Sequence, residues 1–224
     1  MTKENLPTVF DTDTALLVID MQRDFLEPNG YAAKAGLDVD ALRAAVPGVQ
    51  LLLEAARRRG LLVIHTREGH RPDLSDCPPS KMMRSVRAGA AIGSAGPLGR
   101  LLVRGEFGHD FVNSLAPTAS ECVIDKPGYS AFHQTDLQQI LVVRGVRRLI
   151  LCGVTTEVCV HSTLRNAVDL GYPCWVAGDA CASSDNLLHQ AALAMIAAES
   201  GIFGEVLNSD AIATAIYTGI KEKT

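Results

Sequence analysis

The chain has 224 residues, of which 47% are hydrophobic and 21% charged, and this composition fits one globular domain with a sizeable core. Its 21 Lys and Arg against 25 Asp and Glu give a formal charge of −4, without a long basic run, which argues against a nucleic-acid partner. No window approaches the ~20 uninterrupted apolar residues of a membrane-spanning helix. We therefore expect residues 1–224 to form a single soluble domain.

The first twenty residues lack the marks of a secretory signal peptide, because one lysine and then acidic residues precede the short apolar stretch. This predicts a cytoplasmic protein. The six cysteines are dispersed without a CxxC pair, and a reducing compartment argues against a disulfide framework. Four of them lie in or beside strand-like runs and are expected to be small buried hydrophobes: Cys122, Cys152, Cys174 and Cys181.

Short apolar runs of strand length alternate with segments of helical spacing. The predicted strands cover residues 15–19, 61–65, 122–124, 149–152 and 174–177. The predicted helices cover residues 42–59, bent or interrupted at Pro47, then 135–143, 158–170 and 185–199. Apolar strands that alternate with helices suit a parallel sheet covered on both faces. The predicted fold class is a three-layer α/β/α domain with a mostly parallel central sheet.

The least regular region covers residues 68–108 and includes a Gly/Ala-rich stretch as well as Arg84 and Arg87. A structureless segment of this length in a compact domain is usually either functional or disordered.

Three reactive side chains follow predicted strands, at the edge where ligands bind in open parallel sheets. Asp20 ends the first strand, Lys126 follows the third and Cys159 comes after the fourth. Taken singly, Asp20 is as easily a turn or cap residue and Lys126 a surface charge. The three together are a carboxylate, an ammonium and a thiol, which indicates an active site.

Cys159 is the candidate nucleophile. If Thr155 or Thr156 caps the following helix, the thiol lies in its first turn, where free N–H groups and a neighbouring lysine lower a thiol pKa. The same N–H groups, from about Thr155 to Cys159, could receive the oxyanion of a tetrahedral intermediate. Asp20 could take the thiol proton and later deliver it to a leaving amine.

These segments together resemble the isochorismatase-like family of cysteine hydrolases, which includes nicotinamidases, N-carbamoylsarcosine amidases, ureidoacrylate amidohydrolases and biuret hydrolases. The resemblance rests on ALLVIDMQRDF, VIDKPGYSAF, LCGVTTEVCVHSTLRNAVDLGY and VAGDACAS, in the family's order. It implies a triad of Cys159 as nucleophile, Asp20 as general acid/base and Lys126 as electrostatic support. It also implies a cis peptide bond between Val154 and Thr155, and an oxyanion hole built from the backbone of Thr155 and Cys159.

The sequence departs from two patterns of this family, and each departure argues against one kind of reaction. Nicotinamidases of this family carry an Asp-x-His metal motif, whereas HTREGHRPD contains His65 and His70 without it. We therefore expect no catalytic metal and no organic cofactor, with His65 at the end of a strand. Isochorismatases proper lack the nucleophilic cysteine, so the presence of Cys159 argues against vinyl-ether hydrolysis.

The segment TREGHRPDLSDCPPSKMMRS resembles the insertion of ureidoacrylate and biuret hydrolases, and the end of the chain is similar to the biuret branch. The resemblance implies an amidohydrolase that releases ammonia from a linear ureide, biuret or triuret, through a covalent Cys159 intermediate. Alternative substrates are ureidoacrylate, N-carbamoylsarcosine and nicotinamide. A carboxylated substrate would need a fixed cation in the pocket, and Arg23, Arg84 or Arg87 could supply it. A non-catalytic binding protein is the alternative outside the enzymes.

A linear ureide is small, planar and rich in N–H and C=O groups. The predicted aromatic wall for it is formed by Phe25, Tyr129 and Phe132, with core packing as the alternative for Phe132. The predicted polar contacts are Gln22, Arg23 and Glu199, where the alternatives are a surface ion pair for Arg23 and a solvated position for Glu199.

The resemblance also implies a homo-oligomer, commonly a tetramer. The apolar residues 191–198 could supply either an interface or a core face. The small-molecule ureide is the expected partner, with neither nucleic acid nor membrane.

Overall fold

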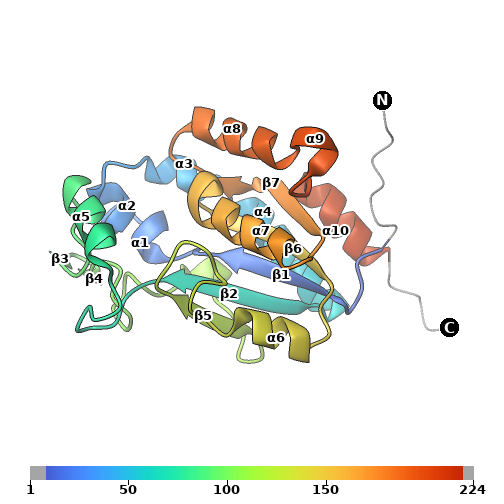
Figure 1. Ribbon diagram of the computed structural model, residues 1–224, viewed down its shortest axis with the longest axis horizontal. Coiled ribbons are helices and arrows are strands. Elements are labelled where there is room, and N and C mark those ends of the chain that lie inside the picture. Colours follow the sequence, from blue (N-terminus) through green and yellow to red (C-terminus); the bar gives the residue numbers. More distant parts are fainter. Residues whose placement is uncertain (1–8, 219–224) are drawn as a thin grey trace.

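The protein is built around a six-stranded sheet (Figure 1), seen in a computed structural model that describes residues 9–218. The strand order is β5-β2-β1-β6-β7-β8, and every neighbouring pair is parallel. The six strands are β1 (Thr14–Ile19), β2 (Leu62–Glu68), β5 (Cys122–Lys126), β6 (Arg148–Val154), β7 (Cys174–Ala182) and β8 (Glu205–Leu207). A separate antiparallel pair joins β3 (Ala95–Gly96) and β4 (Gly99–Arg100).

Helices cover both faces of the sheet. On β1, Leu16 and Val18 face one core while Leu17 and Ile19 face the other, because successive strand residues point to opposite sides. The first core is closed by α3 (Val39–Arg43), α4 (Val46–Arg59) and α10 (Ser209–Tyr217), and the second by α6 (Leu137–Val143), α7 (His161–Asp169) and α8 (Asn186–Ile196). The predicted three-layer α/β/α class with a parallel sheet is confirmed.

The remaining helices are short and gather mostly beyond the carboxyl ends of β1 and β2, at the left of Figure 1. They are α1 (Arg23–Leu26), α2 (Tyr31–Lys34) and α5 (Pro79–Arg87), together with a 3-10 turn at Asn113–Leu115 and α9 (Ala198–Gly201) after α8. Within residues 9–218, no helix combines the length and the apolar character needed to cross a membrane.

The predicted elements are found, with shifted ends. Each predicted strand exists, but β2 continues past His65 to Glu68, so the expectation that His65 ends the strand is wrong. Two helices replace the single predicted helix at 42–59, and Pro47 lies in the first turn of α4, where a missing N–H costs nothing. The helix predicted at 158–170 starts as a π-helical turn, Thr156–Val160, before α7.

The region 68–108 is more ordered than the sequence indicates. It contains the nine-residue helix α5, which begins at Pro79 and ends before Gly89, and the β3–β4 pair. The short helices α1 and α2 also escaped prediction, as did the edge strand β8 and the closing helix α10 near the end of the described chain. These last two fall in the last twenty residues described, where β8 has only three residues and offers little periodicity.

Candidate active site

Four buried side chains meet at the carboxyl edge of the sheet. Asp20 follows β1, Glu68 ends β2, Lys126 ends β5, and Cys159 lies in the turn after β6. Strand register brings them together, because Ile19 pairs with Thr66 across β1 and β2 while Glu68 pairs directly with Lys126. We call these four residues the buried cluster. The three residues predicted from the sequence therefore lie side by side, joined by a glutamate that was not predicted.

The ammonium group of Lys126 lies at the centre of the buried cluster. Its Nζ is 2.8 Å from Asp20 Oδ2, 3.4 Å from Cys159 Sγ and 3.7 Å from Glu68 Oε2. Lys126 is fully buried and also donates to Gly128 O at 3.0 Å. A buried ammonium with these partners is fixed in position and can stabilise negative charge on either the carboxylates or the sulfur.

The position of Asp20 is set by its neighbours. The Thr66 hydroxyl donates to Asp20 Oδ1 at 2.6 Å, and the backbone of Asp20 has a left-handed conformation with φ 53°. Gly153 on β6 lies against the end of β1, and a Cβ at that glycine would collide with the Ile19 carbonyl oxygen. Close approach of β6 and β1 thus requires a glycine just before the turn that carries Cys159.

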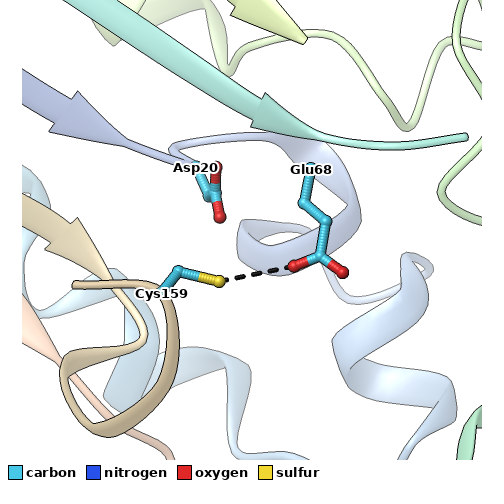
Figure 2. A group of neighbouring side chains, drawn as sticks. All are labelled: Asp20, Glu68 and Cys159. Carbon is cyan, nitrogen blue, oxygen red and sulfur yellow. Dashed lines mark hydrogen bonds between the residues drawn. The ribbon is translucent and has the colours of Figure 1, made fainter. Parts of the chain in front are cut away.

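Glu68 is the functional candidate that sequence reasoning missed. Figure 2 shows its carboxylate facing Cys159, whose thiol donates to Glu68 Oε2 at 3.3 Å. The other oxygen, Oε1, is 2.6 Å from Nζ of Lys81, a buried lysine on α5 that also donates to Pro127 O at 2.7 Å. Lys81 thereby fastens α5 to the site through two contacts.

A sequence signal for Glu68 did exist. Residues Ile64, Thr66 and Glu68 alternate along β2, so they point to the same face of the sheet as the second core. Extending the predicted strand by three residues would have placed a carboxylate at the strand end, beside Asp20. Lys81 carried no such signal, because its burial depends on how α5 packs.

Burial controls the protonation of the cluster. It raises the pKa of the Cys159 thiol well above its usual value, and Lys126 offsets this only in part while Asp20 and Glu68 add to it. This direction is opposite to the expected lowering of the thiol pKa, because burial outweighs the attraction of Lys126 and the two carboxylates add to the effect of burial. The thiol is neutral at rest and donates a hydrogen bond.

The two carboxylates differ in basicity. Burial raises the pKa of Asp20, and the attraction of Lys126 does not cancel this effect. Burial would also raise the pKa of Glu68, but the ammonium groups of Lys126 and Lys81 lower it below the usual value for a glutamate. The pKa of Lys126 is itself raised by Asp20, Cys159 and Glu68 against the effect of burial. Asp20 is therefore the better proton acceptor of the two.

The buried cluster contains side chains of the types that bind metal ions. Donor atoms of Asp20, Glu68 and Cys159 all lie within 4.8 Å of one another. The ammonium of Lys126 already contacts all three, so a cation fills the space in which a metal ion would bind. The two histidines of HTREGH are paired elsewhere, His65 with Glu121 and His70 with Asp76. The donor atoms of Asp20, Glu68 and Cys159 therefore suit the ammonium group of Lys126 better than a metal ion.

The turn carrying Cys159 is held on both sides. The peptide bond between Val154 and Thr155 is cis, and the amides of Val158 and Val160 both donate to Thr155 O at 3.2 Å. Thr156 Oγ1 forms a hydrogen bond of 2.8 Å with His189 Nδ1. These contacts fix the stretch in which the Thr155 and Cys159 N–H groups are predicted to form the oxyanion hole.

Tyr129 and Phe25 occupy different environments. Tyr129 lines a cavity of about 200 Å³ beside α5, with Lys81 Nζ 5.1 Å from the centre of its ring. Phe25 belongs to the first core and packs edge-on against Tyr31 at 6.0 Å, and Tyr31 lines the same cavity. Of the aromatic residues predicted to form a wall for the substrate, only Tyr129 lines this cavity, and its second tyrosine, Tyr31, was not predicted.

The other predicted substrate contacts are engaged elsewhere. The Gln22 side chain is used by backbone groups, donating to Glu68 O and His109 O and accepting from Glu68 N. The Arg23 guanidinium donates to Asn113 Oδ1 at 2.6 Å and lies over the Phe107 ring. Phe132 stacks with Tyr172, and Glu199 is exposed on α9. These four side chains hold structural or surface positions in the single chain.

Comparison with known proteins places this site in a family. The family model described as "Isochorismatase domain" matches residues 14–211. The chain belongs to the isochorismatase-like family of cysteine hydrolases. It is 36% identical over 163 residues to the ureidoacrylate amidohydrolase RutB of Azorhizobium caulinodans, covering 71% of this chain and 72% of that protein. The expectation of family membership is confirmed.

Solved structures agree with this assignment. A cysteine hydrolase from Pseudomonas syringae pv. phaseolicola 1448A superposes with a TM-score of 0.79 at 29% identity, covering 96% of this chain and 100% of that one. An N-carbamoylsarcosine amidase from Thermoplasma acidophilum, 24% identical, shares the fold with a TM-score of 0.67, covering 88% and 96%. These solved structures share the fold of the chain and agree with its place in the isochorismatase-like family.

Proposed function

We propose that this protein is an amidohydrolase that releases ammonia from a small linear ureide, biuret or triuret, through a covalent intermediate on Cys159. The observation that carries the proposal is the contact of one ammonium, Lys126, with both a buried thiol and a buried carboxylate, Asp20. The cavity beside α5 is small, about 200 Å³, and presents charged hydrogen-bonding groups between two tyrosines. Such a cavity suits a compact planar molecule that is rich in N–H and C=O groups.

The pKa order of the carboxylates supports their separate roles. Burial raises the pKa of Asp20 above its usual value, which makes it a better base and suits a group that must both accept and return a proton. Glu68, whose pKa is lowered mainly by Lys126 and Lys81 against the effect of burial, stays ionised throughout. In this proposal Asp20 is the general acid/base, while Glu68 remains a fixed negative charge.

The proposed reaction has two halves. Cys159 Sγ attacks a terminal carbonyl carbon as its proton passes to Asp20, and the N–H groups of Thr155 and Cys159 stabilise the oxyanion. Asp20 then protonates the nitrogen that departs as ammonia, which leaves the rest of the ureide bound to Cys159 as a thioester. Water, deprotonated by Asp20, cleaves the carbon–sulfur bond, which releases a carboxylated ureide and restores the thiol. Lys126 stabilises the sulfur anion in both halves.

A second candidate is a carbamoyl compound that carries a carboxylate, such as ureidoacrylate. The observation favouring it is Arg84, an exposed arginine on α5 that lines the cavity beside Tyr129. A guanidinium at a cavity rim is well suited to bind a carboxylate. The named relative at 36% identity is a ureidoacrylate amidohydrolase, which supports the same class.

Ammonia release separates these candidates. Purified protein is tested with biuret, triuret, ureidoacrylate, N-carbamoylsarcosine and nicotinamide, alongside Cys159→Ser. A matched control, Cys122→Ser, changes a thiol at the start of β5, at the opposite end of that strand from Lys126. We expect turnover of biuret or triuret by the wild type and the control, and none by Cys159→Ser. Turnover of ureidoacrylate alone would favour the second candidate, and silence on every compound would contradict the amidohydrolase proposal.

We also propose a homotetramer. Helix α8 exposes several apolar side chains, namely Leu187 (78% exposed), Leu188 (50%) and Met195 (54%). An apolar helix face of this kind favours burial against another chain. Sedimentation should give four times the 23.9-kDa chain mass, and Met195→Glu should lower it. A monomer at micromolar concentration would contradict this proposal.

A further inference from the structure

The cavity beside α5 and the buried cluster share one side chain. Glu68 lines the cavity together with Tyr31, Lys81, Arg84 and Tyr129, and its Oε2 also contacts the Cys159 thiol at 3.3 Å. A substrate held in the cavity with its carbonyl carbon at the sulfur must therefore pass alongside the Glu68 carboxylate.

Lys81 fixes the direction in which Glu68 points. It holds Oε1 at 2.6 Å and is itself held by Pro127 O at 2.7 Å, so Oε1 is committed to α5. The other oxygen, Oε2, faces the sulfur and lies 3.7 Å from Lys126 Nζ. An ionised carboxylate accepts several hydrogen bonds, and a buried one is costly to leave without donors.

Deprotonation of Cys159 removes the donor that Oε2 has at rest. The S–H to Oε2 hydrogen bond disappears when the thiolate forms, which leaves a carboxylate oxygen 3.3 Å from the sulfur with only the 3.7 Å ion pair to Lys126, so that it can accept a hydrogen bond from a new donor. The attacked carbon sits about 3–3.5 Å from the nucleophile, and the nitrogen bonded to it is only ~1.3 Å further. An N–H on that nitrogen lies within reach of Oε2.

We infer that Glu68, fixed by Lys81, is a specificity-determining residue that accepts a hydrogen bond from the N–H flanking the attacked carbonyl. This inference rests on the proposed function and deepens it. Glu68 therefore selects substrates in which the attacked carbonyl lies between two nitrogen atoms. One nitrogen departs as ammonia, and the other carries the N–H that donates to Glu68. An aryl amide offers only a carbon atom at that position, and an N-methylated ureide offers a methyl group.

The test compares substrates that differ only at this nitrogen. Biuret is paired with 3-methylbiuret, whose central nitrogen carries a methyl group, and N-carbamoylglycine is paired with N-carbamoylsarcosine in the same way. The ratio of kcat/KM within each pair is measured for the wild type, Glu68→Met and Glu68→Met/Lys81→Met. The double variant removes both charges of the ion pair, so that neither is left buried and unpaired.

In the pair that the wild type hydrolyses, we expect replacement of Glu68 to reduce the preference for the N–H substrate by at least about tenfold, since hydrogen bonds to charged groups are among the stronger ones. A control, Glu54→Met, removes an exposed glutamate on α4 and should leave the ratio unchanged. Ratios within twofold of the wild type in both Glu68 variants would overturn the inference while leaving the proposed function intact. A wild type inactive on both pairs and on triuret would overturn both.

Discussion

Removing the ammonium group of Lys126 should destabilise the folded protein, because the buried carboxylates would lose the cation that compensates their charge. In Lys126→Met, Asp20 and Glu68 keep their burial but retain only Lys81 as a cation. Deleting one partner of a buried ion pair typically costs about 3–5 kcal/mol, because the other charge is left without compensation. We expect a loss of that size in the free energy of unfolding at pH 7, and no detectable turnover.

The pH dependence of this loss follows from proton binding. Without Lys126, burial and mutual repulsion keep a proton on one carboxylate in the folded chain, at pH values where the unfolded chain has released it. More protons bound when folded means that the free energy of unfolding falls as pH rises, by about 1.4 kcal/mol per pH unit for one proton. The effect begins above the unfolded carboxyl pKa, near 4.

Urea denaturation of wild type and Lys126→Met between pH 5 and pH 8 measures both quantities. Lys34→Met removes an exposed lysine and serves as the control for the change in net charge. Adding Asp20→Asn to Lys126→Met should recover part of the stability without restoring turnover. Suppose instead that Lys126→Met loses less than about 1 kcal/mol of unfolding free energy and keeps the pH dependence of the wild type. Lys126 would then not stabilise the charges of the buried carboxylates, contrary to this prediction.

Three further predictions concern the thiol, the sheet and metal. Because burial raises the pKa of Cys159 well above its usual value, its alkylation by iodoacetamide should still be accelerating at pH 9, and a plateau by pH 7 would contradict this. Gly153→Ala should lower the free energy of unfolding by at least about 2 kcal/mol, since its Cβ meets the Ile19 carbonyl, whereas Gly171→Ala, with open space around it, should cost about 1 kcal/mol. Prolonged EDTA treatment should leave turnover unchanged, and a loss restored by zinc would show that the buried cluster binds metal.

The sequence predicted the parallel sheet well, because its central strands are apolar throughout. The β1 residues 15–19 and the β6 residues 149–152 form uninterrupted apolar runs, and their short length is typical of strands buried on both faces of a parallel sheet. Strand ends were harder, since polar residues such as Thr66 and Glu68 continue β2 and look like loop. Helix α5 was missed because its position is set by contacts such as Lys81 with Glu68, which lie far apart along the chain.

The structure brings together the predicted site residues that follow strand ends, whereas other predicted contacts have different partners. Asp20, Lys126 and Cys159 come together because parallel strands end at one edge. Gln22 and Arg23 lie beside Asp20 in sequence, yet helix α1 turns their side chains towards His109 and Asn113. A residue that is close to Asp20 in sequence is therefore not necessarily a substrate contact, because a turn of the chain can direct its side chain away from the site.

The most direct test of the account is capture of the covalent intermediate. Wild-type protein is mixed with biuret, quenched in acid within milliseconds to seconds and digested, and the peptide containing Cys159 is examined by mass spectrometry. The account predicts a mass increase on Cys159 equal to that of the substrate less ammonia, absent from Asp20→Asn and from Cys159→Ser. Steady ammonia release without any such adduct, or with the adduct on another cysteine, would contradict the assignment of Cys159 as the nucleophile.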